Sequence, residues 1–354
     1  MNVVSSKRYL ASWSAPIVLA LVLVLVGCSS TPDEEPTPQE WMEQYLDAMR
    51  QDPDAAQAEL ERLTASAPSN DQARNLQFER ARKFLRSDDV ERAREVLEAI
   101  WDEESGDAVA SRAVYELARI AHDVDEDFDQ SYDYLRLAIV ETPPWAGADF
   151  SLDYLLRHQR HPERHQWLED ELRQMADDVE DDRMAARLHL ERGLLLADEL
   201  RHPEPARQAF LAAYQRCPNC AATDDALFEM GQLYERFEKW DAAAMAYAVV
   251  AARVKPASFV GTYTSHRAAA ARYHLGILEL LHRRDYDAAA DHFQRFLDDF
   301  PNHRYTDDSA WHLVRIEELR EDDEAHRRAL DRFVEEFPHS RHAERARLQL
   351  AKMR

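Results

Sequence analysis

Residues 286–301, YDAAADHFQRFLDDFP, place Ala289, Phe293 and Phe296 at positions i, i+4 and i+7 before Pro301. These spacings put the three side chains along one face of a helix, where they can be buried together. The small residue allows a neighbouring helix to approach closely. Proline then ends the helix, because it lacks an amide hydrogen and disfavours helical backbone in the preceding residue.

The same order of a small, a large and an apolar residue recurs through the chain. The further sets are Ala56, Leu60 and Leu63; Ala93, Leu97 and Ile100; Ser131, Leu135 and Ala138; Leu168, Leu172 and Met175; Ala206, Phe210 and Ala213; Ala243, Tyr247 and Val250; and His326, Leu330 and Phe333. Prolines follow at 75-residue intervals (Pro68, Pro143, Pro218) and then at intervals of 38, 45 and 37 residues (Pro256, Pro301, Pro338). This period predicts an all-α protein, a solenoid of about eight helix-turn-helix repeats.

Composition and motifs narrow the classes of function. The 354 residues include seven glycines, and neither GxGxxG nor GxxxxGK[ST] occurs, which argues against Rossmann enzymes and P-loop NTPases. GxSxG, HExxH and SxxK are also absent, so we expect no enzyme, no cofactor and no metal. Because 44 basic residues face 68 acidic ones, for a net charge of −24, we expect no nucleic-acid partner.

Two segments resemble the tetratricopeptide repeat family. The matching residues are Leu227, Met230, Gly231, Tyr234, Ala243 and Tyr247, and then Ala289, Phe293 and Pro301. The resemblance is good over 182–354, taken as C-terminal repeats, and fainter over 39–181, taken as divergent N-terminal repeats. The stretches 300–304 and 337–341 also resemble repeat lipoproteins of bacterial envelope assembly, such as the lipoprotein partner of the outer-membrane β-barrel assembly machine and the Tol-Pal-associated coordinator. The resemblance implies a scaffold that binds envelope proteins or peptides.

The first 27 residues have the pattern of a signal peptide. Lys7 and Arg8 precede ten apolar residues at 17–26, about half the roughly 20 needed to span a bilayer. The sequence LVGC at 25–28 resembles a bacterial lipobox, with Val26 where Ala or Ser is usual. This resemblance implies lipid attachment at Cys28, followed by a proline-rich tether within 28–38. The alternative is an uncleaved anchor with a chance cysteine.

Ser29, in place of Asp, implies sorting to the bacterial outer membrane with the protein facing the periplasm. Acyl chains, rather than a spanning helix, would then hold the protein at the membrane. The sequence does not fix the envelope type.

Cys217-Pro218-Asn219-Cys220 is the most specific local motif. Pro-Asn suits a β-turn, which brings its outer Cα atoms within about 7 Å, a separation compatible with a disulfide. Export to an oxidising compartment favours that interpretation. Two packed thiols, a redox site and a zinc site remain as alternatives, although no βαβ context and no second CxxC are present.

Histidines and acidic runs offer weaker signals. His158, His161 and His165 could supply metal ligands, but a solvated turn is the preferred interpretation. The acidic runs at 123–129, 177–182 and 321–324 lack the glycine of a calcium loop, so we expect them at turns and helix starts, where carboxylates complement the helix dipole.

A groove lined by the first helices of the repeats is the expected binding surface. The candidate residues are Leu227, Tyr234, Tyr273 and Trp311, which lie near that lining or just beneath it and which at these spacings are more often core residues. The alternative function is an accessory subunit of a polysaccharide or peptidoglycan enzyme or of an export complex. A third is a metal or redox module at Cys217 and Cys220. The partner, its peptide motif, the repeats that bind it and the oligomeric state are not predicted.

Overall fold

A computed structural model describes residues 43–44, 47–48, 62–63, 65, 70–103, 106–142, 145–253 and 265–353. The expected signal peptide at 1–27, Cys28 and the tether at 28–38 lie outside these residues. The described part of the chain contains fifteen α-helices and no strand. None of the helices in these ranges is both long and apolar enough to cross a bilayer.

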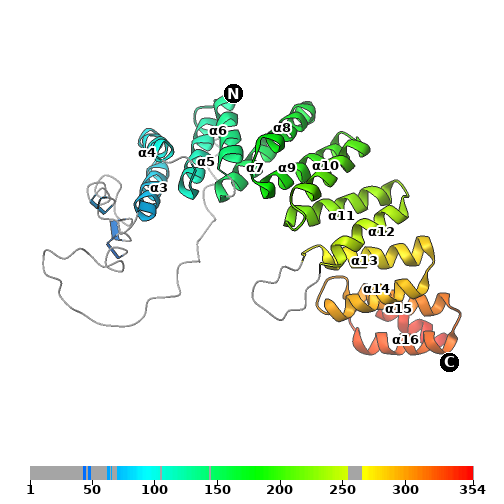
Figure 1. Ribbon diagram of the computed structural model, residues 1–354. Helices are drawn as coiled ribbons and strands as arrows, with labels where there is room; N and C mark the ends of the chain where they lie inside the picture. Colours follow the sequence, from blue (N-terminus) through cyan, green and yellow to red (C-terminus); the bar gives the residue numbers. More distant parts are fainter. Residues whose placement is uncertain are drawn as a thin grey trace, which may run out of the picture.

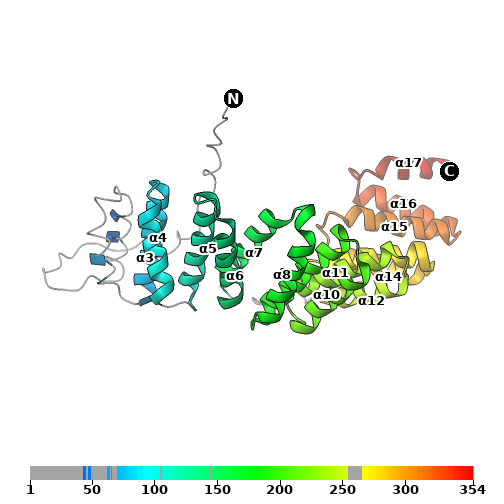
Figure 2. The same ribbon diagram turned by 90° about the horizontal axis from the view of Figure 1, so that it is seen from above.

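The helices follow one another in seven consecutive pairs, and then in α17 (Ala343–Lys352). The two helices pack on each other in every pair except the third, whose first helix packs on the second pair and whose second helix packs on the fourth. The pairs are α3 (Asn70–Arg86) with α4 (Val90–Glu103), α5 (Ala108–Asp123) with α6 (Phe128–Glu141), α7 (Ala146–Gln159) with α8 (His165–Asp178), α9 (Asp182–Leu194) with α10 (Pro203–Arg216), α11 (Ala221–Arg236) with α12 (Trp240–Ala251), α13 (Ala268–Leu278) with α14 (Tyr286–Asp299), and α15 (Thr306–Leu319) with α16 (Asp323–Glu336). The pairs stack into a curved array, seen as an arch in Figure 1 and as an elongated row in Figure 2. The expected all-α solenoid of TPR-like helix pairs is confirmed.

The second helix of each pair buries the face that the sequence pattern marks. In α14, Ala289, Phe293 and Phe296 are fully buried, and the corresponding residues of α4, α6, α8, α10, α12 and α16 are also core residues. The helices α10, α14 and α16 end directly before the dipeptides that contain Pro218, Pro301 and Pro338. The predicted burial pattern is therefore confirmed for these helices.

Glycines in three first helices let an aromatic ring of the second helix lie against the backbone. The contacts are Gly193 with Phe210, Gly231 with Tyr247, and Gly276 with Phe293. A Cβ added at any of these glycines would lie between 2.4 and 2.7 Å from a ring carbon. The absence of a side chain is therefore what allows each pair of helices to close.

Two first helices end in a π-helical segment. These are η2 (Leu195–Glu199) after α9 and η3 (Glu279–Arg283) after α13. In both pairs the glycine and its ring are 17 residues apart, whereas Gly231 and Tyr247 are 16 apart. A π-helical turn holds an extra residue, so it keeps the contact despite the longer sequence.

The turns within pairs share a left-handed residue that is not glycine. Positive φ values of 54° to 64° occur at Asp88, Glu126, Arg201, Glu238, Arg284 and Glu321. Among the described residues, the turn between α7 and α8 has none and instead contains the short helix η1 (Pro162–Arg164). Several acidic residues of these turns cap the following helix, as Asp127 does for α6 and Asp322 for α16.

Candidate functional site: a cleft across three first helices

A cleft of about 540 Å³ crosses the first helices of three successive pairs. Its lining residues are Asp198 from η2; Glu229, Gln232, Glu235 and Arg236 from α11; Trp240 from α12; His274 from α13; and His282 from η3. Each π-helical segment thus contributes one side chain. Such segments are frequent at functional sites, because the wider turn changes the direction of the side chains it carries.

Paired side chains form the walls of this central cleft. Arg236 donates to Asp198 at 2.8 Å, which joins α11 to η2. His274 Nδ1 lies 3.1 Å from Glu235 Oε1, and the Trp240 and His282 rings stack with centroids 3.5 Å apart. The polar walls and the aromatic platform are therefore positioned by contacts between successive pairs.

Glu229 is the electrostatically unusual residue of the central cleft. Its side chain is 20% exposed, and burial raises the pKa of its carboxyl group. The nearest cation, Arg267, lies 3.7 Å from it and also binds Asp225 at 2.5 Å. A partly desolvated carboxylate with a shared counter-ion would gain from a further positive charge brought by a ligand.

Two of the four expected groove residues belong to the core. Leu227 and Trp311 are each 4% exposed. Leu227 packs in the cluster that joins α9 to α13, and Trp311 packs against Phe333 and stacks on His342. Their apolar character reflects packing within the stack, so these two residues do not line a groove.

The two tyrosines occupy intermediate positions. Tyr234 is partly buried against the same core cluster as Leu227. Tyr273 stacks on Tyr305 with centroids 4.5 Å apart, and its hydroxyl lies 3.2 Å from His312 Nε2. Burial and the nearby Asp308 raise the pKa of Tyr273 to about 12. Neither tyrosine is among the residues that line the central cleft.

The cleft residues follow the expected ones closely in sequence. Glu235 and Arg236 come directly after Tyr234, and His274 follows Tyr273. A helical step of about 100° per residue turns these neighbours toward the cleft. The missed signal was therefore the polar face of the first helices.

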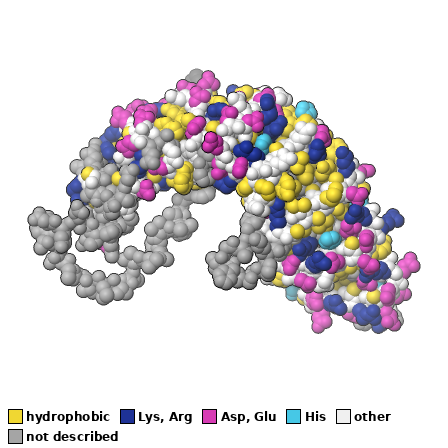
Figure 3. Space-filling model, viewed as in Figure 1, with side chains coloured by type: hydrophobic (Ala, Val, Ile, Leu, Met, Phe, Trp, Pro, Cys, Tyr) yellow, Lys and Arg dark blue, Asp and Glu magenta, His cyan; other side chains and the backbone are white. Residues whose placement is uncertain are grey.

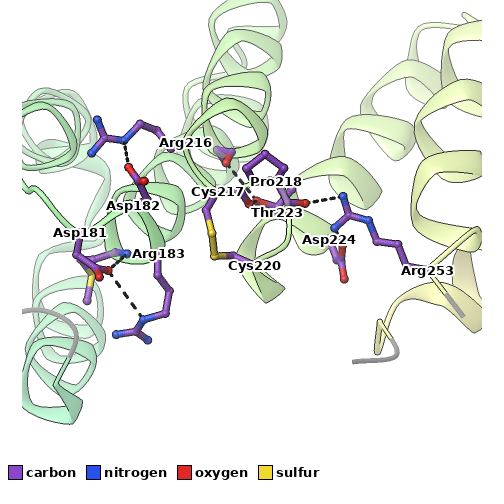
Figure 4. Close-up of a disulfide and its surroundings, with 12 residues drawn as sticks. Asp181, Asp182, Arg183, Arg216, Cys217, Pro218, Cys220, Thr223, Asp224 and Arg253 are labelled. Atoms are coloured by element: carbon purple, nitrogen blue, oxygen red, sulfur yellow. Dashed lines mark hydrogen bonds and ion pairs between the residues drawn. A yellow bond between two sulfur atoms is a disulfide. The ribbon is translucent and has the colours of Figure 1, made fainter. Parts of the chain in front are cut away.

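The structure joins Cys217, at the end of α10, to Cys220, at the start of α11, in a disulfide (Figure 4). Their Cα atoms are 5.5 Å apart, and the Cys220 amide donates to the Cys217 carbonyl at 3.2 Å. The His303 amide makes the same 3.2 Å bond to the Phe300 carbonyl in a turn without cysteines. The same hydrogen-bonded turn therefore occurs elsewhere in the chain without a disulfide.

The three histidines of the 158–165 stretch have separate surroundings. His158 stacks on Tyr154 with centroids 4.2 Å apart, His161 is exposed, and His165 is buried at the start of α8. Burial and the neighbouring His122 lower the pKa of His158. Within the described ranges, no group of three or more His, Cys, Asp and Glu side chains is arranged to hold a metal ion.

Residues 270–303 match the family model described as Tetratricopeptide repeat. This segment covers α13 and α14, the pair that closes through Gly276 and Phe293. No curated protein is similar enough to count as a relative.

Among solved structures, the chain is similar to PilW, a type IV pilus biogenesis factor (14% identity; 77% of this chain and 98% of that chain; TM-score 0.35). It is also similar to PilF of Pseudomonas aeruginosa (15% identity; 79% and 98%; TM-score 0.35). A third is PH0952 of Pyrococcus horikoshii, a signal-transduction ATPase with a tetratricopeptide repeat sensor (14% identity; 83% and 45%; TM-score 0.46). These values assign no function to this chain.

Proposed function

We propose that this protein is a non-enzymatic, lipid-anchored scaffold on the periplasmic face of a bacterial outer membrane. It binds envelope proteins through the central cleft, and Cys28 carries the lipid. The observation that carries the binding role is the cleft itself, a polar surface with an aromatic platform built from three successive helix pairs. Side chains from separate pairs that converge on one hollow suit recognition of a partner segment.

Charge supports a basic partner. The chain has a net charge of −24, and Glu229 in the cleft is incompletely compensated by Arg267. A segment with Lys or Arg would supply the missing positive charge, and the overall field would speed its approach at low salt.

Photo-crosslinking in living bacteria tests the binding surface. A photoreactive amino acid at Gln232, in the cleft, is compared with the same amino acid at Gln208, which is exposed on α10. We expect a specific crosslinked protein from position 232 that is absent at 208. Equal products from both positions would contradict the assignment. The identity of the partner separates an assembly scaffold from an accessory subunit of an envelope enzyme or export complex.

The Cys28→Ala variant tests the anchor. Without the thiol no acyl chain can be attached, so we expect the protein to move from the membrane fraction to the soluble fraction. The distribution is measured by fractionation and immunoblotting, with the Cys217→Ser variant as a matched control that keeps Cys28. Retention of Cys28→Ala in the membrane fraction would show that another feature attaches the protein.

A further inference from the structure

Exposed apolar side chains recur at the ends of the first helices, beside the turns within pairs. They are Val124 (54% exposed), Phe237 (51%), Leu281 (48%) and Leu319 (42%). Each precedes a left-handed turn residue by one to three positions, as Phe237 precedes Glu238. We call the surface made by residues 123–128, 198–203, 235–241, 279–287 and 317–323 the turn edge.

Three clefts lie along the turn edge, two between successive turns and one between the α15–α16 turn and the end of α17. The first, of about 310 Å³, is lined by residues that include Arg201, Pro203, Leu233 and Phe237. The central cleft continues from Arg236 and Trp240 to His282. A third, of about 280 Å³, includes Glu318, Asp322 and Met353. Hollows and exposed apolar residues thus alternate along this side of the solenoid.

Three arginines of the turn edge are held by acidic residues of the preceding turn. Arg236 pairs with Asp198 at 2.8 Å, and Arg283 pairs with Asp241 at 2.5 Å. Arg320 pairs with Asp287 in the same way. These contacts occupy three of the positive charges of the edge, whereas Arg201, Lys239 and Arg284 form no ion pair with a described residue.

Further acidic residues of the same edge stay available. Glu238 and Glu321, at the centres of two turns, form no ion pair with any described residue. Asp322 and Asp323 lie beside Glu321, and no arginine or lysine lies in the stretch 321–324. The turn edge therefore presents apolar side chains among a surplus of carboxylates.

We propose that the turn edge binds a basic amphipathic helix of a partner protein, laid across successive turns. This inference rests on the proposed scaffold function and extends its binding surface beyond the central cleft. Side-chain ion pairs join these turns to their neighbours, as Arg236 with Asp198 and Arg283 with Asp241, so equivalent residues of successive turns lie within the reach of two paired side chains. Two turns of an α-helix rise about 10.8 Å, so an apolar residue at every seventh position of the partner meets successive turns. Lysines or arginines between them face the carboxylates.

Binding of two synthetic helices to the purified chain tests the proposal. The probe is a helix of about 21 residues with leucine at every seventh position and flanking lysines, and the counter-probe replaces each lysine with glutamate. We expect the lysine helix to bind, with an affinity that falls as salt rises, and the glutamate helix not to bind. Equal binding of both helices, or binding of neither, would overturn the proposal.

A matched pair of variants locates the surface. The edge variant is Phe237→Ser/Leu281→Ser/Leu319→Ser, and the control is Met245→Ser/Val249→Ser. The control residues lie on α12 and are 67% and 41% exposed. They test whether any exposed apolar surface would serve, because hydrophobic side chains also gather over the middle of the arch (Figure 3). All five are exposed, so we expect unchanged helicity. We expect the edge variant to lose about tenfold or more in affinity and the control to keep it. Equal losses would contradict the assignment to the turn edge.

A charge variant and the crosslinking experiment complete the test. Glu238→Lys/Glu321→Lys should weaken binding of the lysine helix and permit binding of the glutamate helix, and an unchanged preference would overturn the proposal. The cellular crosslink at Gln232 is then measured in the edge variant. A crosslink that persists at full yield refutes the role of the turn edge but leaves the proposed function intact, whereas no crosslink in the native chain refutes the proposed function itself.

Discussion

The C-terminal pairs and the α5–α7 region use glycine in two different ways. In α9, α11 and α13 the glycine faces an aromatic ring of the second helix of the same pair. In α7, Gly147 instead faces the backbone of α5, where an added Cβ would lie 2.2 Å from the Ser111 carbonyl oxygen. The first contact closes a pair, and the second joins neighbouring pairs. One repeated topology is therefore held together by two kinds of close approach.

The surroundings of the two contacts differ in the same way. Ser111 is fully buried, and its Oγ lies 2.8 Å from Thr142 Oγ1. Small polar residues thus fill the junction between α5 and α7. In the α13–α14 pair, by contrast, Gly276 and Phe293 meet through apolar surface. The family model matches residues 270–303, where the packing is of the first kind, with a glycine against an aromatic ring. The repeated topology of this chain therefore occurs with two different kinds of contact between helices.

Alanine substitutions at the two kinds of glycine should give the largest difference in stability between the two regions. In Gly147→Ala the obstacle is backbone, so we expect a loss of about 3 kcal/mol or more in the free energy of unfolding. In Gly231→Ala the Tyr247 ring can shift, and the gain in helix propensity offsets part of the strain, so we expect about 1–2 kcal/mol. Urea unfolding measured by circular dichroism gives both values.

Gly106→Ala is the matched control, because nothing lies within 4 Å of a Cβ at that position. We expect its stability to stay within about 0.5 kcal/mol of the native chain. Losses of similar size at Gly147 and Gly231 would show that the two contacts are equally adaptable, which would remove the distinction between the regions.

Acid should weaken the C-terminal pairs more than the N-terminal ones. The His312 ring stacks on Phe293 with centroids 4.9 Å apart, and burial lowers its pKa to about 4, with Arg315, His342 and Arg341 opposing its protonation and Asp308 favouring it. The unfolded chain takes up this proton near pH 6.5, so the stabilisation is complete above that pH and is lost as the pH falls toward 4. The full loss is roughly 3 kcal/mol.

Urea unfolding at pH 7.5 and pH 5 measures this dependence. His312→Phe removes the titrating group while keeping a ring against Phe293, so we expect it to lose less stability between the two pH values than the native chain. His158→Phe serves as the N-terminal counterpart. Burial also lowers the pKa of His158, but the His158 ring is less buried than that of His312. A pH dependence unchanged in His312→Phe would assign the acid sensitivity to other groups.

The buried face of the second helices was predictable from sequence, because each set such as Ala289, Phe293 and Phe296 obeys one spacing and ends at a proline. The binding face of the first helices was not predictable in this way, because the residues that line the cleft are polar, whereas the expected groove residues are apolar or aromatic and pack toward the core. Leu227 and Trp311 are large side chains of the kind that lines a binding groove, but both are buried in the core. Burial separates the two cases, and burial depends on contacts between neighbouring pairs.

The π-helical segments and the turn edge show a second limit. The 17-residue interval between Gly193 and Phe210 is visible in the sequence, but its consequence, a wide turn that carries Asp198 into the cleft, is a property of backbone geometry. Likewise, the left-handed conformation of Glu238 or Glu321 has no signature in a chain that places glycine at none of these turns.

Glycine substitutions at the turns should give the smallest changes in stability. The change should have one sign in a C-terminal left-handed turn and the opposite sign in the α7–α8 turn. Glu238 has φ of 54°, a conformation that costs a residue with a Cβ about 1–2 kcal/mol, so we expect Glu238→Gly to stabilise the chain by about 0.5–1 kcal/mol after the larger entropy of the unfolded glycine is included. His161, in the α7–α8 turn, has φ of −112°, which any residue adopts. Only the entropic term then remains, so His161→Gly should destabilise by about 0.5–1 kcal/mol. Parallel urea unfolding curves decide the matter, since destabilisation by both substitutions would mean that the left-handed turns carry no strain for glycine to relieve.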